Sequence, residues 1–186
     1  MRTFQVLLIT TFIAFSWLGF IVVHEFGHVI VGALSGATLS RIVLHPLQIS
    51  WSMFAPNPHP QLVAWGGPVL GVLLPLALFA LARAFRSPGV YLFQFFAGFC
   101  LVANGVYMLI DAFDRSGDAG TLLHRGASAW QILLFGVVAT PLGFRLWHGL
   151  GRHFGIPSGR VSHSAAFVST GLLVVTVAIE LLLYKS

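Results

Sequence analysis

Five long apolar runs constrain this sequence more than any other feature. A helix needs roughly 20 apolar residues to cross a bilayer, and only 8% of the residues here are charged, whereas soluble domains carry about 25%. The sequence therefore predicts an all-α polytopic membrane protein with about five transmembrane helices. We expect residues 1–186 to form one integral membrane domain whose main surroundings are the lipid bilayer. The predicted spans are Phe4–Leu34, Leu62–Phe85, Gly89–Ile110, Trp130–Leu150 and Ala165–Tyr184.

The segment between the first two spans has a different pattern. Residues Ala37–Met53 are rich in β-branched side chains and partly alternate between apolar and polar. A cluster of chain-breaking prolines follows at Pro56, Pro58 and Pro60. This combination predicts a short β hairpin or edge strand after the first span.

The charged residues exclude one class of partner. The formal net charge is +5, but the cations lie between the apolar runs and at their ends, and they form no basic patch with interleaved aromatic residues. Nucleic-acid binding requires such a patch, so the sequence argues against it.

The motif His24-Glu25-Phe26-Gly27-His28 lies inside the first apolar run. On a helix the two histidines are one turn apart on the same face, so they can bind one metal ion. Glu25 can reach a water held by that metal and act as its base. Zinc suits this arrangement because catalytic zinc sites use three protein ligands and keep a position for water. The sequence therefore predicts one zinc ion with His24 and His28 as ligands and Glu25 as catalytic base.

Chance and cost both argue that this motif is functional. A shuffled chain of this composition would contain the pattern with a probability of about 0.4%. A glutamate in the middle of a membrane helix costs on the order of 2.5 kcal/mol or more, and such residues are usually functional. A polar patch that pairs with another helix is the structural alternative.

Topology limits the choice of a third ligand. His28 lies toward the far end of the first span, on the face that the chain reaches again at the end of the third span. A carboxylate from that region would complete a two-histidine, one-acid zinc site. The candidate acids are Asp111, Asp114 and Asp118, and the outlying candidates are His45, His59 and His124.

These features resemble the site-2 protease family of intramembrane zinc metalloproteases, in particular its small bacterial members without appended soluble domains. The motif at His24–His28 matches the HExxH of that family, which also lies in a membrane helix. The second signature of the family, LDGG with an upstream asparagine, has a looser counterpart in Asn104 and Gly117–Leu123. The resemblance implies that Asp118 is the third zinc ligand and that Ala37–Met53 holds a substrate-binding strand.

The chain also departs from the family pattern. Fourteen positions separate Asn104 from Asp118, more than is usual, and the proline normally found between them is absent. Asp111 therefore stays open as the alternative third ligand. Gly71 stands where the family often has an asparagine. Asn104 either supports the substrate or a ligand, or holds two helices together.

The membrane orientation is open. Six of the ten basic residues fall on the same face as the N-terminus in a five-span arrangement, which favours a cytoplasmic N-terminus. The resemblance favours the opposite, because the family places its catalytic face near the cytosol. The four basic residues on the other face are Arg41, Arg115, Arg125 and Lys185.

The function expected from the motif and the resemblance is zinc-dependent hydrolysis of peptide bonds in a membrane-embedded protein or peptide. We expect such a hydrolase in the inner membrane of a bacterial cell. The alternative is a non-proteolytic, degenerate relative that uses the same fold for a structural or binding role. A metal or proton transporter is disfavoured, because outside the first motif the spans contain almost no ionisable residues.

Overall fold

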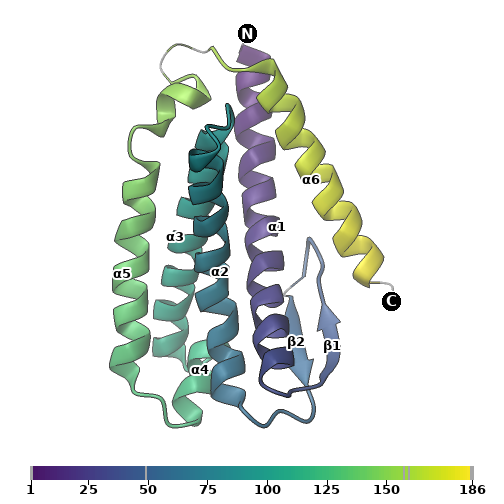
Figure 1. Ribbon diagram of the computed structural model, residues 1–186, viewed down its shortest axis with the longest axis vertical. Coiled ribbons are helices and arrows are strands. Elements are labelled where there is room, and N and C mark those ends of the chain that lie inside the picture. The colour runs from purple at the N-terminus through teal and green to yellow at the C-terminus, as the bar shows by residue number, and fades with distance from the viewer. Residues whose placement is uncertain (1, 49, 157, 159, 185–186) are drawn as a thin grey trace.

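The computed structural model describes residues 2–48, 50–156, 158 and 160–184. Helices dominate this part of the chain, and the only strands in it form one small hairpin (Figure 1). The elements in chain order are α1 (Arg2–Leu34), β1 (Leu39–Val43), β2 (Trp51–Phe54), α2 (Pro60–Ala84), α3 (Val90–Asp114), α4 (Gly117–His124), α5 (Ala129–Trp147), η1 (Leu150–Phe154) and α6 (His163–Tyr184).

Five of these helices, α1, α2, α3, α5 and α6, are long and apolar enough to cross a membrane. This confirms the predicted helical, five-span fold. Helix α1 has 33 residues, which corresponds to about 50 Å and exceeds the roughly 30 Å hydrocarbon core of a bilayer. The remaining α-helix in the described part of the chain, α4, has only eight residues.

The predicted third span ends too early. The prediction stopped at Ile110, whereas α3 continues to Asp114 before Arg115 ends it. Asp111 is therefore a buried residue of the helix and does not belong to the polar connection. The other helix ends agree with the predicted spans to within three residues.

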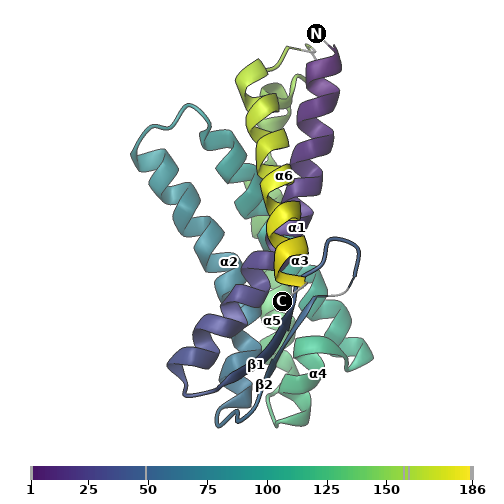
Figure 2. The ribbon, with the colours of Figure 1, turned by 90° about the vertical axis from the view of Figure 1, so that its right-hand side faces the viewer.

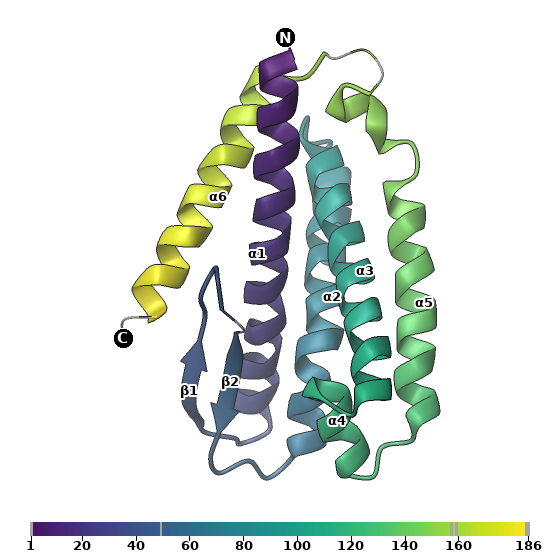
Figure 3. The same cartoon turned by 180° about the vertical axis from the view of Figure 1, so that it is seen from behind.

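The helices form one bundle with α1 near its middle. Helix α1 packs against α2 on one side and α6 on the other, and α3 packs against α2 and α5 (Figures 1 and 3). Helix α6 starts beside the N-terminus, where Phe4 stacks on His163 at 4.1 Å, and it runs in the same direction as α1. The two helices diverge toward the C-terminal end of α6 (Figure 1).

Glycines bring α1 and α2 into backbone contact. A Cβ on Gly27 would collide with the carbonyl oxygen of Gly66, and a Cβ on Gly66 would lie 2.7 Å from the carbonyl oxygen of Gly27. Small residues at such crossings allow membrane helices to approach closely. The contact falls within the His24–His28 motif, so α2 forms one wall of the region around it.

The predicted hairpin is present. Strands β1 and β2 pair antiparallel, with Val43 opposite Trp51 and Ile42 opposite Ser52. The hairpin lies beside the C-terminal half of α1, below the end of α6 (Figure 2). It fits directly on α1, because a Cβ on Gly32 would lie 2.6 Å from the ring of Phe54. Within the predicted segment Ala37–Met53, Ile49 lies outside the described residues, as does the basic residue Lys185.

Candidate metal centre

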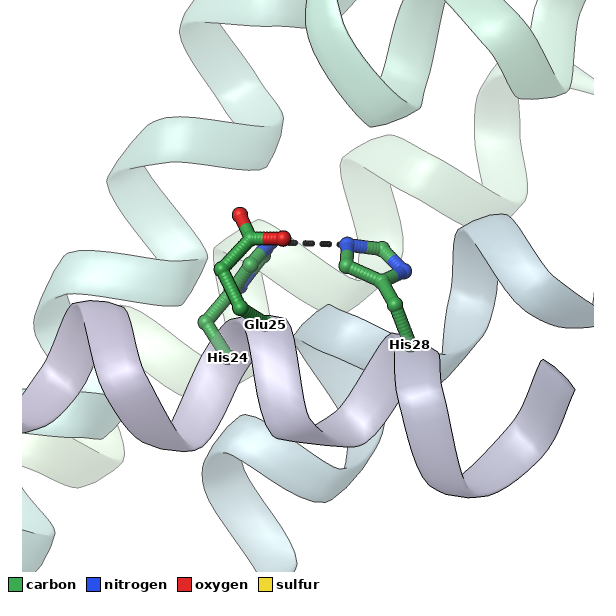
Figure 4. A group of neighbouring side chains, drawn as sticks. All are labelled: His24, Glu25 and His28. Carbon is green, nitrogen blue, oxygen red and sulfur yellow. Dashed lines mark hydrogen bonds between the residues drawn. The ribbon is translucent and has the colours of Figure 1, made fainter. Parts of the chain in front are cut away.

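His24 and His28 lie one turn apart on α1 and are both buried, with 6% and 7% of their surface exposed. Their imidazole rings converge, and the two Nε2 atoms are 3.2 Å apart (Figure 4). This is the geometry expected for two histidines at positions i and i+4 of one helix face. The pair is the starting point of the site.

A hydrogen bond on its far side orients His24. Nδ1 of His24 lies 2.8 Å from Oδ1 of Asn104 on α3, and Nδ2 of Asn104 donates to the Cys100 carbonyl at 2.9 Å. Because the amide is fixed in this way, its oxygen faces the histidine and accepts a hydrogen bond. Nδ1 must then carry the proton, which leaves the lone pair of Nε2 available to a metal.

His28 is oriented in the same manner by the backbone of α2. Its Nδ1 lies 2.7 Å from the Val63 carbonyl oxygen, which can only accept a hydrogen bond. The N–H of Gly67 approaches the same nitrogen at 3.3 Å, but the shorter bond to the carbonyl decides that Nδ1 carries the proton. Nε2 of His28 therefore presents its lone pair toward Nε2 of His24.

Asp118, in the first turn of α4, is the acid that the fold brings to the histidines. Its Oδ2 lies 2.9 Å from Nε2 of His24 and 3.3 Å from Nε2 of His28. Burial by itself would raise the pKa of Asp118, but in the metal-free site hydrogen bonds from the Nε2 atoms of His24 and His28, in the state in which these atoms carry a proton, outweigh burial and lower this pKa to about 2. Asp118 is therefore a carboxylate at neutral pH, which is the form that binds metal.

A tight reversal after α3 delivers Asp118 to this position. Arg115 adopts a left-handed φ of 53° and ends α3, and Gly117 has a φ of 50° at the start of α4. A Cβ on Gly117 would collide with the carboxylate of Asp111 and the hydroxyl of Tyr107. Glycine at this position is thus required both by its backbone conformation and by the space around it.

Asp111, the alternative third ligand, does not reach the histidines. Its Oδ1 accepts a hydrogen bond from the Ser116 hydroxyl at 3.1 Å. Among the described residues it forms no hydrogen bond or ion pair with His24 or His28. The same holds for the remaining candidates, Asp114, His45, His59 and His124, and of these His45 instead packs its ring edge-on against Tyr184 at 4.6 Å.

Glu25 lies next to His24 on α1, and a residue of the hairpin binds its carboxylate. The Ser52 hydroxyl of β2 donates a hydrogen bond to Oε2 of Glu25. Glu25 and His24 line a cavity of about 600 Å³ whose other walls include Trp17, Phe20 and Tyr107. We call this space the motif cavity. Its lining is mostly apolar, and Glu25 is among the few polar residues in it.

The donor set fits a zinc ion. Two ligand atoms bound at about 2.05 Å to a tetrahedral zinc lie about 3.3 Å apart. Here Oδ2 of Asp118 lies 2.9 Å from Nε2 of His24 and 3.3 Å from Nε2 of His28, and the two Nε2 atoms are 3.2 Å apart. Two lone pairs and one carboxylate oxygen at such distances repel one another unless a cation lies among them, either a shared proton or a metal. Glu25 also offers a carboxylate oxygen, which lies within 4.8 Å of the histidine nitrogens, and its Oε2 accepts a hydrogen bond from Ser52.

Two further residues shape the site, one that the sequence marks only as a glycine permitting close helix approach, Gly67, and one that it leaves without a role, Ser52. A Cβ on Gly67 would collide with Nε2 of His28 and lie 2.7 Å from Nε2 of His24, so this glycine leaves the room in which a metal can bind. Ser52 was inside the predicted strand but had no role assigned to it. The glycine pair Gly66-Gly67 signals a close helix approach, but which side chains it faces depends on how α2 crosses α1, and nothing local signals Ser52, because it acts across a strand contact.

No protein-family model matches the chain, and neither a curated protein nor a solved structure matches it.

Proposed function

We propose that the chain is an intramembrane zinc endopeptidase of the site-2 protease type. One observation carries the proposal, namely the convergence of His24 Nε2, His28 Nε2 and Asp118 Oδ2 within 3.3 Å of one another. Both histidines have their outer nitrogens bonded to acceptors, so their inner nitrogens are left as metal ligands. Two histidines and one carboxylate form a common ligand set of catalytic zinc.

Each residue of the site has a distinct role in the proposed reaction. His24, His28 and Asp118 hold the zinc. When bound, zinc supplies a Lewis acid that polarises the substrate carbonyl and makes a water nucleophilic at neutral pH. Glu25 accepts the proton of the attacking water at its carboxylate and donates it to the departing amine. The Ser52 hydroxyl keeps the Glu25 carboxylate turned toward the motif cavity.

The surroundings support a membrane-embedded substrate. The motif cavity has largely apolar walls, with Trp17, Phe20 and Ile21 of α1 among them, and the described part of the chain has five helices long and apolar enough to span a membrane. A helical substrate must unwind locally before cleavage, because its backbone groups are already paired. Strand β2 pairs with β1 along one edge, and its other edge can hold the unwound segment by strand addition.

The resemblance to small bacterial site-2 proteases extends the proposal to a location. We place the protein in the inner membrane of a bacterial cell, with a single zinc ion and a membrane protein or peptide as its partner.

The decisive test is the variant Glu25→Gln in the full-length protein. The variant should retain zinc, measured by elemental analysis of the purified protein, and lose cleavage of a co-expressed single-span substrate tagged at both ends. Removal of a general base costs about 10²- to 10⁴-fold in rate. Asp118→Ala is the companion variant and should lose zinc as well as cleavage.

Two results would contradict the proposal in different ways. Unchanged cleavage by Glu25→Gln would exclude the mechanism. A wild-type protein that holds zinc but cleaves none of a panel of single-span substrates would favour the degenerate, non-proteolytic alternative.

A further inference from the structure

Tyr107 connects the candidate metal centre to a part of α3 that the proposed reaction does not use. It lies one turn after Asn104, so both residues lie on the same helix face. Its ring packs edge-on against His24, with ring centroids 5.4 Å apart and ring planes at 88°. The side chain lines the motif cavity and also a second, almost wholly apolar hollow of about 400 Å³ between α1 and α3. Tyr107 is therefore part of the wall between these two spaces.

The hydroxyl of Tyr107 supports the first turn of α4. The backbone N–H of Asp118 donates to this hydroxyl at 3.3 Å. The first N–H groups of a helix lack partners within the helix and need an acceptor from elsewhere. Ser116, the N-cap residue of α4, makes no capping side-chain bond and instead donates to Asp111. Tyr107 thus replaces the usual cap at the residue that carries the candidate ligand.

Asp111 offers an acceptor for the one proton of the Tyr107 hydroxyl. Its Oδ2 is buried and lacks a hydrogen-bond partner of good geometry within the described part of the chain. The Tyr107 hydroxyl lies near this oxygen. A Cβ added to Gly117 would collide with both Oδ2 of Asp111 and the hydroxyl oxygen of Tyr107, so the two atoms flank the same point. A buried carboxylate oxygen without a donor is costly, and a hydroxyl hydrogen rotates to suit its neighbours. The phenol can therefore donate to Asp111 while it accepts from Asp118.

We propose that Tyr107 is a positioning residue of the metal centre, with Asp111 as the residue that orients it. The Tyr107 ring fixes the imidazole plane of His24, and the hydroxyl fixes the backbone of Asp118 and hence its carboxylate. Asp111 thereby acts on the metal ligands indirectly, by orienting the Tyr107 hydroxyl. The inference rests on the metal-binding part of the proposed function and is independent of whether the chain cleaves peptides.

The variant Tyr107→Phe tests the inference with the full-length protein in detergent. It keeps the ring on His24 and removes only the hydroxyl. Zinc affinity, measured by competition with a chelator, should fall by about 10-fold or more, because partners that orient metal ligands typically contribute 10- to 100-fold. The visible absorption of the cobalt(II)-loaded protein, which reports ligand geometry, should shift as well. The matched control is Tyr91→Phe, which removes the hydroxyl of a second tyrosine of α3, one that packs in the aromatic cluster with Phe154.

A second variant, Asp111→Asn, keeps the shape of the side chain and removes its charge, and it decides the outcome if Tyr107→Phe does not fold. Its zinc affinity should fall in the same direction and by less. Zinc affinity and a cobalt spectrum equal to wild type in the folded variants would overturn the inference alone. A wild-type protein that binds neither zinc nor cobalt would overturn the proposed function and the inference together.

Discussion

The two halves of α1 are packed by different means. In the N-terminal half, Leu8 and Phe12 are buried in a cluster with large apolar side chains of α3 and η1 and with two alanines of α6. In the C-terminal half, Gly27 brings the backbone of α1 onto that of α2, and the buried residues around it include His24 and His28. The first half is joined by interlocking side chains and the second by direct backbone contact around polar groups.

This difference sets how each half responds to change. Large side chains can repack when one of them is shortened, and the cost is that of the cavity that remains. Backbone contact leaves no such freedom, because an added methyl group must displace a helix or a ligand. We therefore expect changes in the C-terminal half to abolish metal binding, and changes in the N-terminal half to lower stability and spare the site.

The largest effect is expected from Gly67→Ala. The added Cβ would collide with Nε2 of His28 and lie 2.7 Å from Nε2 of His24, which fills the space a metal needs. Zinc content by elemental analysis should fall to background. Gly171→Ala on α6 is the control, because a Cβ there meets nothing within 4 Å, and its zinc content should match wild type. Full zinc in Gly67→Ala would mean that α1 and α2 can separate at the site.

An intermediate effect is expected from Asn104→Ala. The change leaves Nδ1–H of His24 without the acceptor that now lies at 2.8 Å, so the imidazole is free to turn. Chelator competition should show zinc affinity lower by about 10- to 100-fold. Gln94→Ala removes another amide of the same helix, one that donates to the Leu146 carbonyl, and should leave zinc affinity unchanged. Equal losses in both variants would point to a general loosening of α3.

The smallest effect on the site is expected from Phe12→Ala, although its effect on stability is clear. Phe12 is 2% exposed, and truncation of a buried phenylalanine to alanine costs about 3 to 5 kcal/mol, of which the cavity left behind is one part. The unfolding midpoint in denaturing detergent should fall while zinc per chain stays constant. Phe26→Ala, at a 54% exposed position in the other half, should change the midpoint little. Zinc loss in Phe12→Ala would show that the two halves are coupled.

Much of the fold was readable because lipid acts on each segment separately. A chain in hydrocarbon must pair its backbone within a helix and cover it with apolar side chains. Each span can therefore be recognised from its own length and composition. The hairpin was readable from β-branched residues followed by prolines. The pairing of His24 with His28 followed from helical periodicity alone. All of these signals lie within stretches of a few to about 30 residues.

The parts that could not be predicted depend on contacts between segments. Gly67 matters because α2 crosses α1 where the histidines lie, and Ser52 matters because β2 reaches Glu25. Tyr107 carried a weak signal, since it shares a helix face with Asn104, but its hydroxyl acquires a role only once α4 folds back onto α3.

The sequence alone thus determined a bundle of apolar helices, a hairpin and a buried histidine pair with an adjacent glutamate. It left the acid that faces the pair open among Asp111, Asp114 and Asp118, and only the family resemblance favoured Asp118. The tertiary structure decides in favour of Asp118, because α3 runs on to Asp114 and the left-handed residues Arg115 and Gly117 then turn the chain back toward α1. Backbone conformation over those few residues places one carboxylate at the histidines and the other behind Tyr107, and no periodicity in the sequence encodes that turn.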